Sequence, residues 1–232
     1  GVNAGNSIAS GGNYNVVVGD EAGTAITTGD NNVAVGFEAL KTLATSSQNT
    51  AVGHTALKFN TAANNSAFGY GALAANSSGT ANLAVGRSAL AANTTADANT
   101  AVGYNSLAAN TTGTENTAVG TEALNATITG SYNTAVGRSA LLLTTGDHNT
   151  AVGRIALRTN SSGANNTALG SRSMYSNSSG DNNTAVGVNA LDANTTASNN
   201  TAVGHSSLTA NTTGTLNVAI GTQALDANTT GD

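Results

Sequence analysis

The chain has 232 residues, of which 39% are hydrophobic, 3% aromatic and 8% charged, and its formal net charge is −5. Typical soluble domains are about 25% charged and fill their cores with bulkier side chains, so this composition argues against a core of ordinary width. The sparse negative charge includes no basic run, which excludes the electrostatic footprint of a nucleic-acid-binding protein. Without cysteine the chain has no disulfide framework, and no apolar stretch approaches the roughly 20 residues of a membrane span.

One short unit repeats along the sequence and can be located by the glycine that ends Asn-Thr-Ala-Val-Gly. This anchor glycine occurs thirteen times, from Gly19 to Gly221, at a spacing of 17 residues ten times and 16 residues twice. Both shorter units lose a residue in the polar stretch typified by ANTTG, which is the behaviour of a surface turn. We therefore expect about fourteen coils in one repeat domain over residues 1–232, with a short first coil over 1–19 and regular coils over 20–232.

Within a unit, the first expected strand is the Asn-Thr-Ala-Val-Gly segment. Around 99–103, alternation places Thr100 and Val102 on one face and Asn99 and Ala101 on the other. Because the Val position stays apolar in every unit, we expect Val to face the core and Ala to face solvent. The second expected strand follows, with Leu107 and Ala109 inward and a variable residue exposed between them.

These elements predict an all-β protein, a parallel β-solenoid in the form of a flat, two-sided β-roll with two short strands per coil. Helical repeats are excluded by the internal glycines and by the absence of an apolar stripe at a 3.6-residue period. A triangular helix of hexapeptides is excluded because 17 is not a multiple of six. The polar, Gly-rich composition suggests disorder as the alternative, but the strict recurrence of apolar columns argues against it.

Two invariant columns indicate structural roles. The anchor glycine requires either a positive φ or a neighbour that leaves no room for a Cβ, and both explanations remain open. Its predicted corner positions are Gly36, Gly53, Gly86, Gly103 and Gly120. The Asn before each first strand either forms a ladder of stacked amides or shapes a turn, and these interpretations also remain open.

The Ala of the first strand is the expected surface for self-association. An exposed strand position normally varies, whereas this one is Ala in twelve units and Val17 in the first. A strip of Ala is flat and apolar, which suits contact with another copy; the alternative is that Ala is merely tolerated in a crowded sheet. The predicted face consists of Ala34, Ala51, Ala84, Ala101, Ala118 and Ala135.

The column after the anchor glycine is the candidate ligand or receptor stripe. Aromatic and cationic side chains at this corner could stack on sugars, although an exposed corner that is free to vary is the alternative. The stripe comprises Phe37, His54, Tyr70, Arg87 and Tyr104. No catalytic motif, metal-ligand cluster or cofactor fingerprint accompanies it, so we expect no catalytic residues, no metal and no cofactor.

The stretch NTAVGYNSLAANTTG resembles the head repeats of trimeric autotransporter adhesins, which carry a similar Ser-Val-Ala-Ile-Gly element. It is still more similar to the NTAVG-x-x-AL repeats of phage and bacterial tail-fibre-like proteins. The resemblance covers nearly the whole chain and implies a left-handed, trimeric β-roll that serves as a rigid fibre on a cell or virion surface.

The expected function is a non-enzymatic, extracellular fibre segment that binds copies of itself, as a homotrimer or by head-to-tail stacking into a filament. Joining Asp232 to Gly1 would place Gly5 16 residues after Gly221, an allowed coil length. A host receptor or surface glycan is a further expected partner, whereas nucleic acid and membrane insertion are not expected. The alternative is a monomeric ice-binding or carbohydrate-binding solenoid, and the apparently inward Thr argues against ice binding.

Overall fold

The computed structural model describes residues 1–232 and has thirteen parallel three-residue strands and no helix, which confirms the predicted parallel β-solenoid. The chain divides into two compact units, which are described separately: unit 1, Gly1–Glu115, and unit 2, Asn116–Asp232. Unit 1 contains β1 (Val16–Val18), β2 (Val33–Val35), β3 (Thr50–Val52), β4 (Ser66–Phe68), β5 (Leu83–Val85) and β6 (Thr100–Val102). Unit 2 contains β7 (Thr117–Val119), β8 (Thr134–Val136), β9 (Thr150–Val152), β10 (Thr167–Leu169), β11 (Thr184–Val186), β12 (Thr201–Val203) and β13 (Val218–Ile220).

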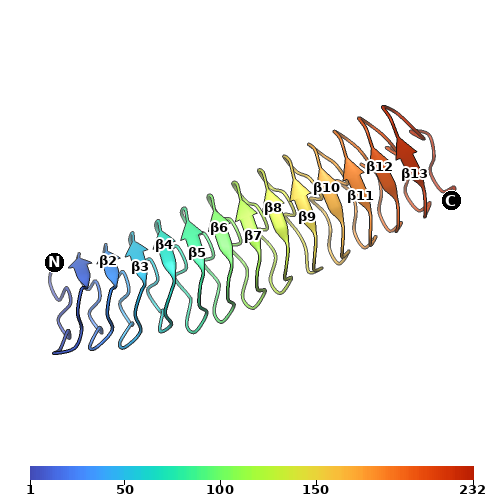
Figure 1. Ribbon diagram of the computed structural model, residues 1–232. Helices are drawn as coiled ribbons and strands as arrows, with labels where there is room; N and C mark the ends of the chain where they lie inside the picture. Colours follow the sequence, from blue (N-terminus) through green and yellow to red (C-terminus); the bar gives the residue numbers. More distant parts are fainter. The chain divides into compact units, whose positions relative to one another are not determined.

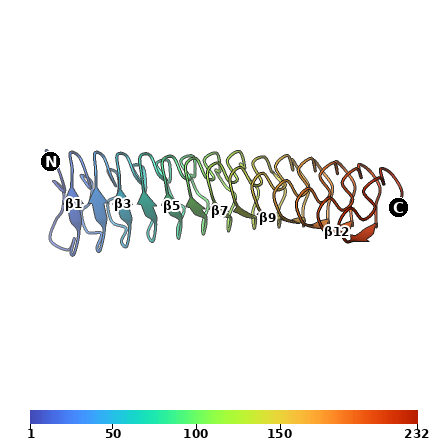
Figure 2. The same ribbon diagram turned by 90° about the horizontal axis from the view of Figure 1, so that it is seen from above.

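Within each unit, every strand pairs in parallel with the strand of the next coil. The register keeps identical positions opposite each other, as in Ala34↔Ala51 of unit 1 and Ala168↔Ala185 of unit 2. In Figures 1 and 2, successive arrows of a unit lie side by side and are joined by loops that return to the start of the next strand. One 16- or 17-residue repeat is therefore one coil of backbone.

The predicted orientation of the first strand is wrong, because its middle Ala faces the interior and its Thr and Val face outward. Ala101 and Ala185 have no exposed surface, whereas Val119 is 37% and Leu169 is 47% exposed. The coil is narrow, so its interior holds only a methyl group at this position from β2 to β13, and the larger Val17 occurs in the first strand, where it is partly exposed. The β-branched side chains occupy the outer surface of the sheet, where an extended backbone also favours them.

The predicted second strand is also wrong, because the segment around Leu107 is a series of turns. Eleven leucines of this column have φ between +47° and +52°, in the left-handed region that breaks an extended strand. Ser106 and Leu107 are both buried, and the next two residues are partly exposed, so the alternation of a strand is absent. A left-handed residue costs about 1–2 kcal/mol, and burial of a Leu side chain offsets a cost of that size.

Both explanations for the anchor glycine hold together. Its φ lies between +125° and +141° in all thirteen coils, a region that only glycine adopts without strain. A Cβ on Gly36 would lie 2.5 Å from the carbonyl oxygen of Gly53 in the next coil, and one on Gly120 would lie 2.7 Å from that of Gly137. Any side chain here would separate two coils.

The Asn before each strand links successive coils and shapes the turn, so its two interpretations also combine. The side-chain oxygen of Asn166 accepts a hydrogen bond from the backbone N–H of Asn183 at 3.0 Å. Its side-chain nitrogen donates to the carbonyl of Gly180 at 2.8 Å. The same pair of bonds recurs along each unit, and it satisfies polar backbone groups that the narrow coil buries.

A second Asn column, at the start of the ANTTG stretch, lies inside the coil. Asn93 donates from its side-chain nitrogen to the side-chain oxygen of Asn76 at 2.9 Å, and Asn177 donates to Asn160 at 2.8 Å. These amides are completely buried, so this is a true amide ladder. The sequence predicts only a surface turn for this stretch. The recurrence of Asn in this column is the signal that could have indicated the ladder.

Candidate functional site

The outer surface of the strands is the most uniform exposed feature of each unit, and we call it the Thr–Val face. It consists of the first and third residues of every strand, which lie in two parallel files. Successive residues of a file are one coil apart, about 4.8 Å in a parallel sheet. The first file comprises Val16, Val33, Thr50, Ser66, Leu83, Thr100, Thr117, Thr134, Thr150, Thr167, Thr184, Thr201 and Val218.

The third residues of the strands give the Thr–Val face its apolar character. The second file comprises Val18, Val35, Val52, Phe68, Val85, Val102, Val119, Val136, Val152, Leu169, Val186, Val203 and Ile220. Neither file contains a charged residue. Phe68, Val119 and Val136 are each about two-fifths exposed. A monomeric soluble protein rarely exposes apolar side chains in a continuous array of this kind, and such arrays usually mark contact surfaces.

The predicted self-association face of alanines is wrong. Ala34, Ala51, Ala84, Ala101, Ala118 and Ala135 all have no exposed surface. They are invariant because the coil interior leaves room for one methyl group. The sequence signal for the Thr–Val face is an Ala flanked by two β-branched residues. A narrow coil can place only the small Ala inward, so the β-branched residues must face outward.

The predicted corner stripe does form one continuous stack in unit 1. The rings of Phe37 and His54 lie 5.0 Å apart, and those of His54 and Tyr70 lie 4.9 Å apart. The Arg87 guanidinium lies 5.8 Å from the ring centroids of both Tyr70 and Tyr104. These side chains stack face to face, so mainly their ring edges remain exposed. Stacking of a sugar ring on an aromatic face is therefore not favoured.

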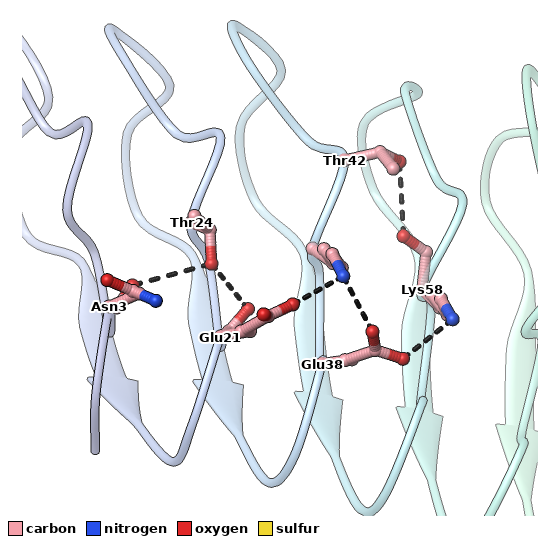
Figure 3. Close-up of polar contacts among 7 residues, drawn as sticks. Asn3, Glu21, Thr24, Glu38, Thr42 and Lys58 are labelled. Atoms are coloured by element: carbon pink, nitrogen blue, oxygen red, sulfur yellow. Dashed lines mark hydrogen bonds and ion pairs between the residues drawn. The ribbon is translucent and has the colours of Figure 1, made fainter.

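Beside this corner, unit 1 carries an ion-pair network across three coils (Figure 3). Lys41 pairs with Glu21 and with Glu38, the latter at 2.6 Å, and Lys58 pairs with Glu38 at 2.6 Å. Hydrogen bonds from Lys41 and Lys58 lower the pKa of Glu38. Hydrogen bonds to Glu21 and Glu38 raise the pKa of Lys41 to about 12. The lysines of unit 1 are thus neutralised by neighbouring carboxylates.

No group of three or more His, Asp or Glu side chains is placed to hold a metal ion, and neither unit contains a pocket. The structure has no helix that is long and apolar enough to span a membrane. Comparison with protein-family models, curated proteins and solved structures found no match to this chain. The surface features themselves therefore carry the functional argument.

Proposed function

We propose that this chain is a non-enzymatic, rigid segment of an extracellular fibre, of the tail-fibre or adhesin-like type, whose copies associate through the Thr–Val face. The observation that carries the proposal is the uncharged, partly apolar face along each unit. The fold needs Ala, Asn and Gly inside the coil, but it does not need Thr and Val in place of charged residues outside. Burial against a second copy would explain that restriction.

The Thr–Val face of each unit is large enough to contribute to such a contact. A three-residue strand is about 10 Å long and lies about 4.8 Å from its neighbour, so the face covers roughly 290 Å² in unit 1 and roughly 340 Å² in unit 2 before the adjoining columns are added. A standard protein interface covers about 800 Å² per partner, so the adjoining columns would contribute the rest. Three copies around a common axis, as the resemblance implies, would each bury this face.

A matched pair of substitutions tests the proposal by light scattering. Val186→Lys places a charge on the Thr–Val face, whereas Val188→Lys places the same charge two residues later, at an exposed corner. We expect the native chain and Val188→Lys to form the same oligomer and Val186→Lys to have a lower mass. A native chain that is monomeric at all concentrations would contradict the proposal, whereas an oligomer mass of three chains would support the homotrimer.

Ice binding is the second candidate, and one observation favours it. The Thr hydroxyls face outward, which removes the argument against ice binding that the sequence suggested. In unit 2 the first file is Thr from β7 to β12, and Val, Leu or Ile fills the file beside it. In unit 1 the first file mixes Val, Thr, Ser and Leu, which is a poorer match to a regular lattice. A monomer with thermal-hysteresis activity that Thr167→Lys abolishes would replace the fibre proposal with this one.

A further inference from the structure

The positive charge of the chain is concentrated in one part of unit 2. The chain has seven Lys and Arg residues in all, and four of them lie between residues 138 and 172: Arg138, Arg154, Arg158 and Arg172. The same segment contains one acidic residue, Asp147, whose carboxylate accepts a hydrogen bond from the backbone N–H of Ser131. A chain with a net charge of −5 therefore carries a local excess of positive charge.

The fold brings these four arginines together in three consecutive coils. Arg138 and Arg154 occupy the same column, two residues beyond the paired positions Val136↔Val152. The backbone carbonyl of Arg154 in turn accepts a hydrogen bond from the N–H of Arg172, at 3.1 Å. Successive coils in a parallel sheet are about 4.8 Å apart, so the guanidinium groups of Arg138 and Arg154 can reach one small anionic group together.

Tyr175 organises the other side of this arginine cluster. The Arg172 guanidinium lies 4.7 Å from the Tyr175 ring centroid, and Arg158 donates a hydrogen bond to the Tyr175 hydroxyl at 3.3 Å. Arg172 also pairs with Asp192 at 3.0 Å, which raises the pKa of Arg172. The Arg172–Asp192 ion pair lies at one edge of the cluster. Arg158, beside Arg172, is partly exposed.

Three of the four arginines have no carboxylate partner. Arg138, Arg154 and Arg158 form no ion pair, and Arg138 and Arg154 are exposed. The nearby Glu122, one coil before Arg138, accepts a hydrogen bond from the Ser139 hydroxyl. Guanidinium groups without a carboxylate partner are donors for carboxylate and sulfate oxygens, which they bind in a planar, bidentate manner.

We propose that the arginine cluster, Arg138, Arg154 and Arg158, binds the carboxylate or sulfate groups of an acidic polysaccharide. Nucleic acid is the less suitable polyanion, because single strands require free aromatic faces and the Tyr175 ring is already covered by Arg172. Duplexes require many phosphate contacts, more than three arginines supply. The hydroxyls of Ser171 and Thr159 beside the cluster donate to the backbone carbonyls of Arg154 and Tyr175, so their oxygens remain as acceptors for the hydroxyl groups of sugars. This inference does not depend on the fibre role, since the cluster lies outside the Thr–Val face.

Calorimetric titration of the full chain at low salt tests the proposal with five probes. The probes are a heparin tetrasaccharide, an oligogalacturonate of similar length, a neutral dextran oligosaccharide, inorganic sulfate and a short single-stranded DNA. We expect binding of one or both acidic saccharides, weaker binding at higher salt, and no binding of dextran. The first two probes distinguish sulfate from carboxylate recognition, and inorganic sulfate that binds as tightly as the saccharides would overturn the assignment to a polysaccharide.

Substitutions then locate the binding site. Arg138→Gln with Arg154→Gln should lower the affinity for the acidic saccharide at least about tenfold, because two charge-assisted contacts are lost. Arg87→Gln is the matched control, since Arg87 occupies the same column in unit 1, and it should leave the affinity unchanged. Equal affinity of the double variant and the native chain, or preferential binding of single-stranded DNA, would overturn the proposal. Light scattering on the same samples reports self-association separately.

Discussion

The inside and the outside of each coil both repeat, but they repeat for different reasons. Inside, the Ala, the two Asn columns and the anchor glycine are each fixed by a contact with the next coil. Outside, the corner column changes freely from Phe37 to His54, Tyr70 and Arg87. The Thr–Val face, two residues earlier, is also at the surface, although most of its side chains are only partly exposed, and it contains no charged residue. Exposure alone permits variation, so the constancy of this face indicates a constraint from outside the fold.

The comparison also shows how invariance misleads. An invariant Ala in a strand suggested a contact surface, whereas it reports only the width of the interior. The more variable file of Val, Phe, Leu and Ile suggested a core, whereas its variation shows that no tight packing is required within the chain. A position tolerates substitution least where its side chain meets the next coil, and four substitutions can test that rule.

The largest effect is expected at the anchor glycine. Gly69→Ala would place a Cβ 2.6 Å from the carbonyl oxygen of Gly86, at a φ of +137° that side chains avoid. We expect a loss of about 3 kcal/mol or more in the free energy of unfolding, measured with urea. Gly71→Ala is the control, because its φ is +64° and nothing lies within 4 Å of the added Cβ. It should cost only about 1–2 kcal/mol, as a left-handed residue does, and equal losses for the two variants would refute the steric argument.

The recurrence of residues predicts part of this fold, whereas the backbone conformation and the width of the interior cannot be predicted from it. The period, the parallel stacking and the positions of the corners follow from recurrence, because one repeat must equal one coil. The second strand could not be recognised as turns, because a Leu with φ near +50° is rare and only the stacked coils make it favourable. The predicted orientation of Ala101 was wrong for a similar reason. Alternation defines the two faces of a strand, but the width of the interior decides which face is buried.

The candidate site was less accessible to sequence analysis than the fold. The corner stripe was correctly grouped, since residues at one phase of the repeat must lie in one column. The stacking of its rings on each other depends on side-chain directions, which the sequence does not specify. The excess of positive charge between residues 138 and 172 is visible in the sequence, but only the structure shows that Arg158 lies beside Arg172 at Tyr175.

The second effect concerns the orientation of the strand. Ala185→Val adds two methyl groups to a position with no exposed surface, between Ala168 and Ala202 of the adjacent coils. Overpacking of this kind should lower the free energy of unfolding by about 2–3 kcal/mol. Val186→Ala, on the outer file, should cost under about 1 kcal/mol. The opposite order of the two losses would restore the orientation expected from the sequence.

The third effect concerns the buried amides. Asn183→Ala leaves the backbone N–H of Asn200 without the side-chain oxygen that it contacts at 3.0 Å. The loss of a buried partner should cost about 1–2 kcal/mol, and hydrogen exchange at the Asn200 amide should accelerate. Asn182→Ala is the control, because Asn182 is exposed and the equivalent positions of other coils accommodate Ala81 and Ala98 at φ near +58°. Unchanged exchange at Asn200 would show that the amide column does not link the coils.

The smallest effect is expected in the ion-pair network, where Glu38 is largely buried between Lys41 and Lys58. These lysines lower the pKa of Glu38 from its ordinary value of 4.5, so its ionised form favours the folded state. The contribution is complete above the ordinary pKa and disappears as the pH falls through the lowered one. Glu38→Gln should therefore reduce the Tm by about 1–2 °C at pH 7 and low salt, and the difference should shrink as the pH falls below 4.5. Glu115→Gln, at an exposed Glu without an ion pair, should leave the Tm unchanged over the same pH range. A difference for Glu38→Gln that does not shrink as the pH falls would mean that packing, rather than charge, holds this side chain in place.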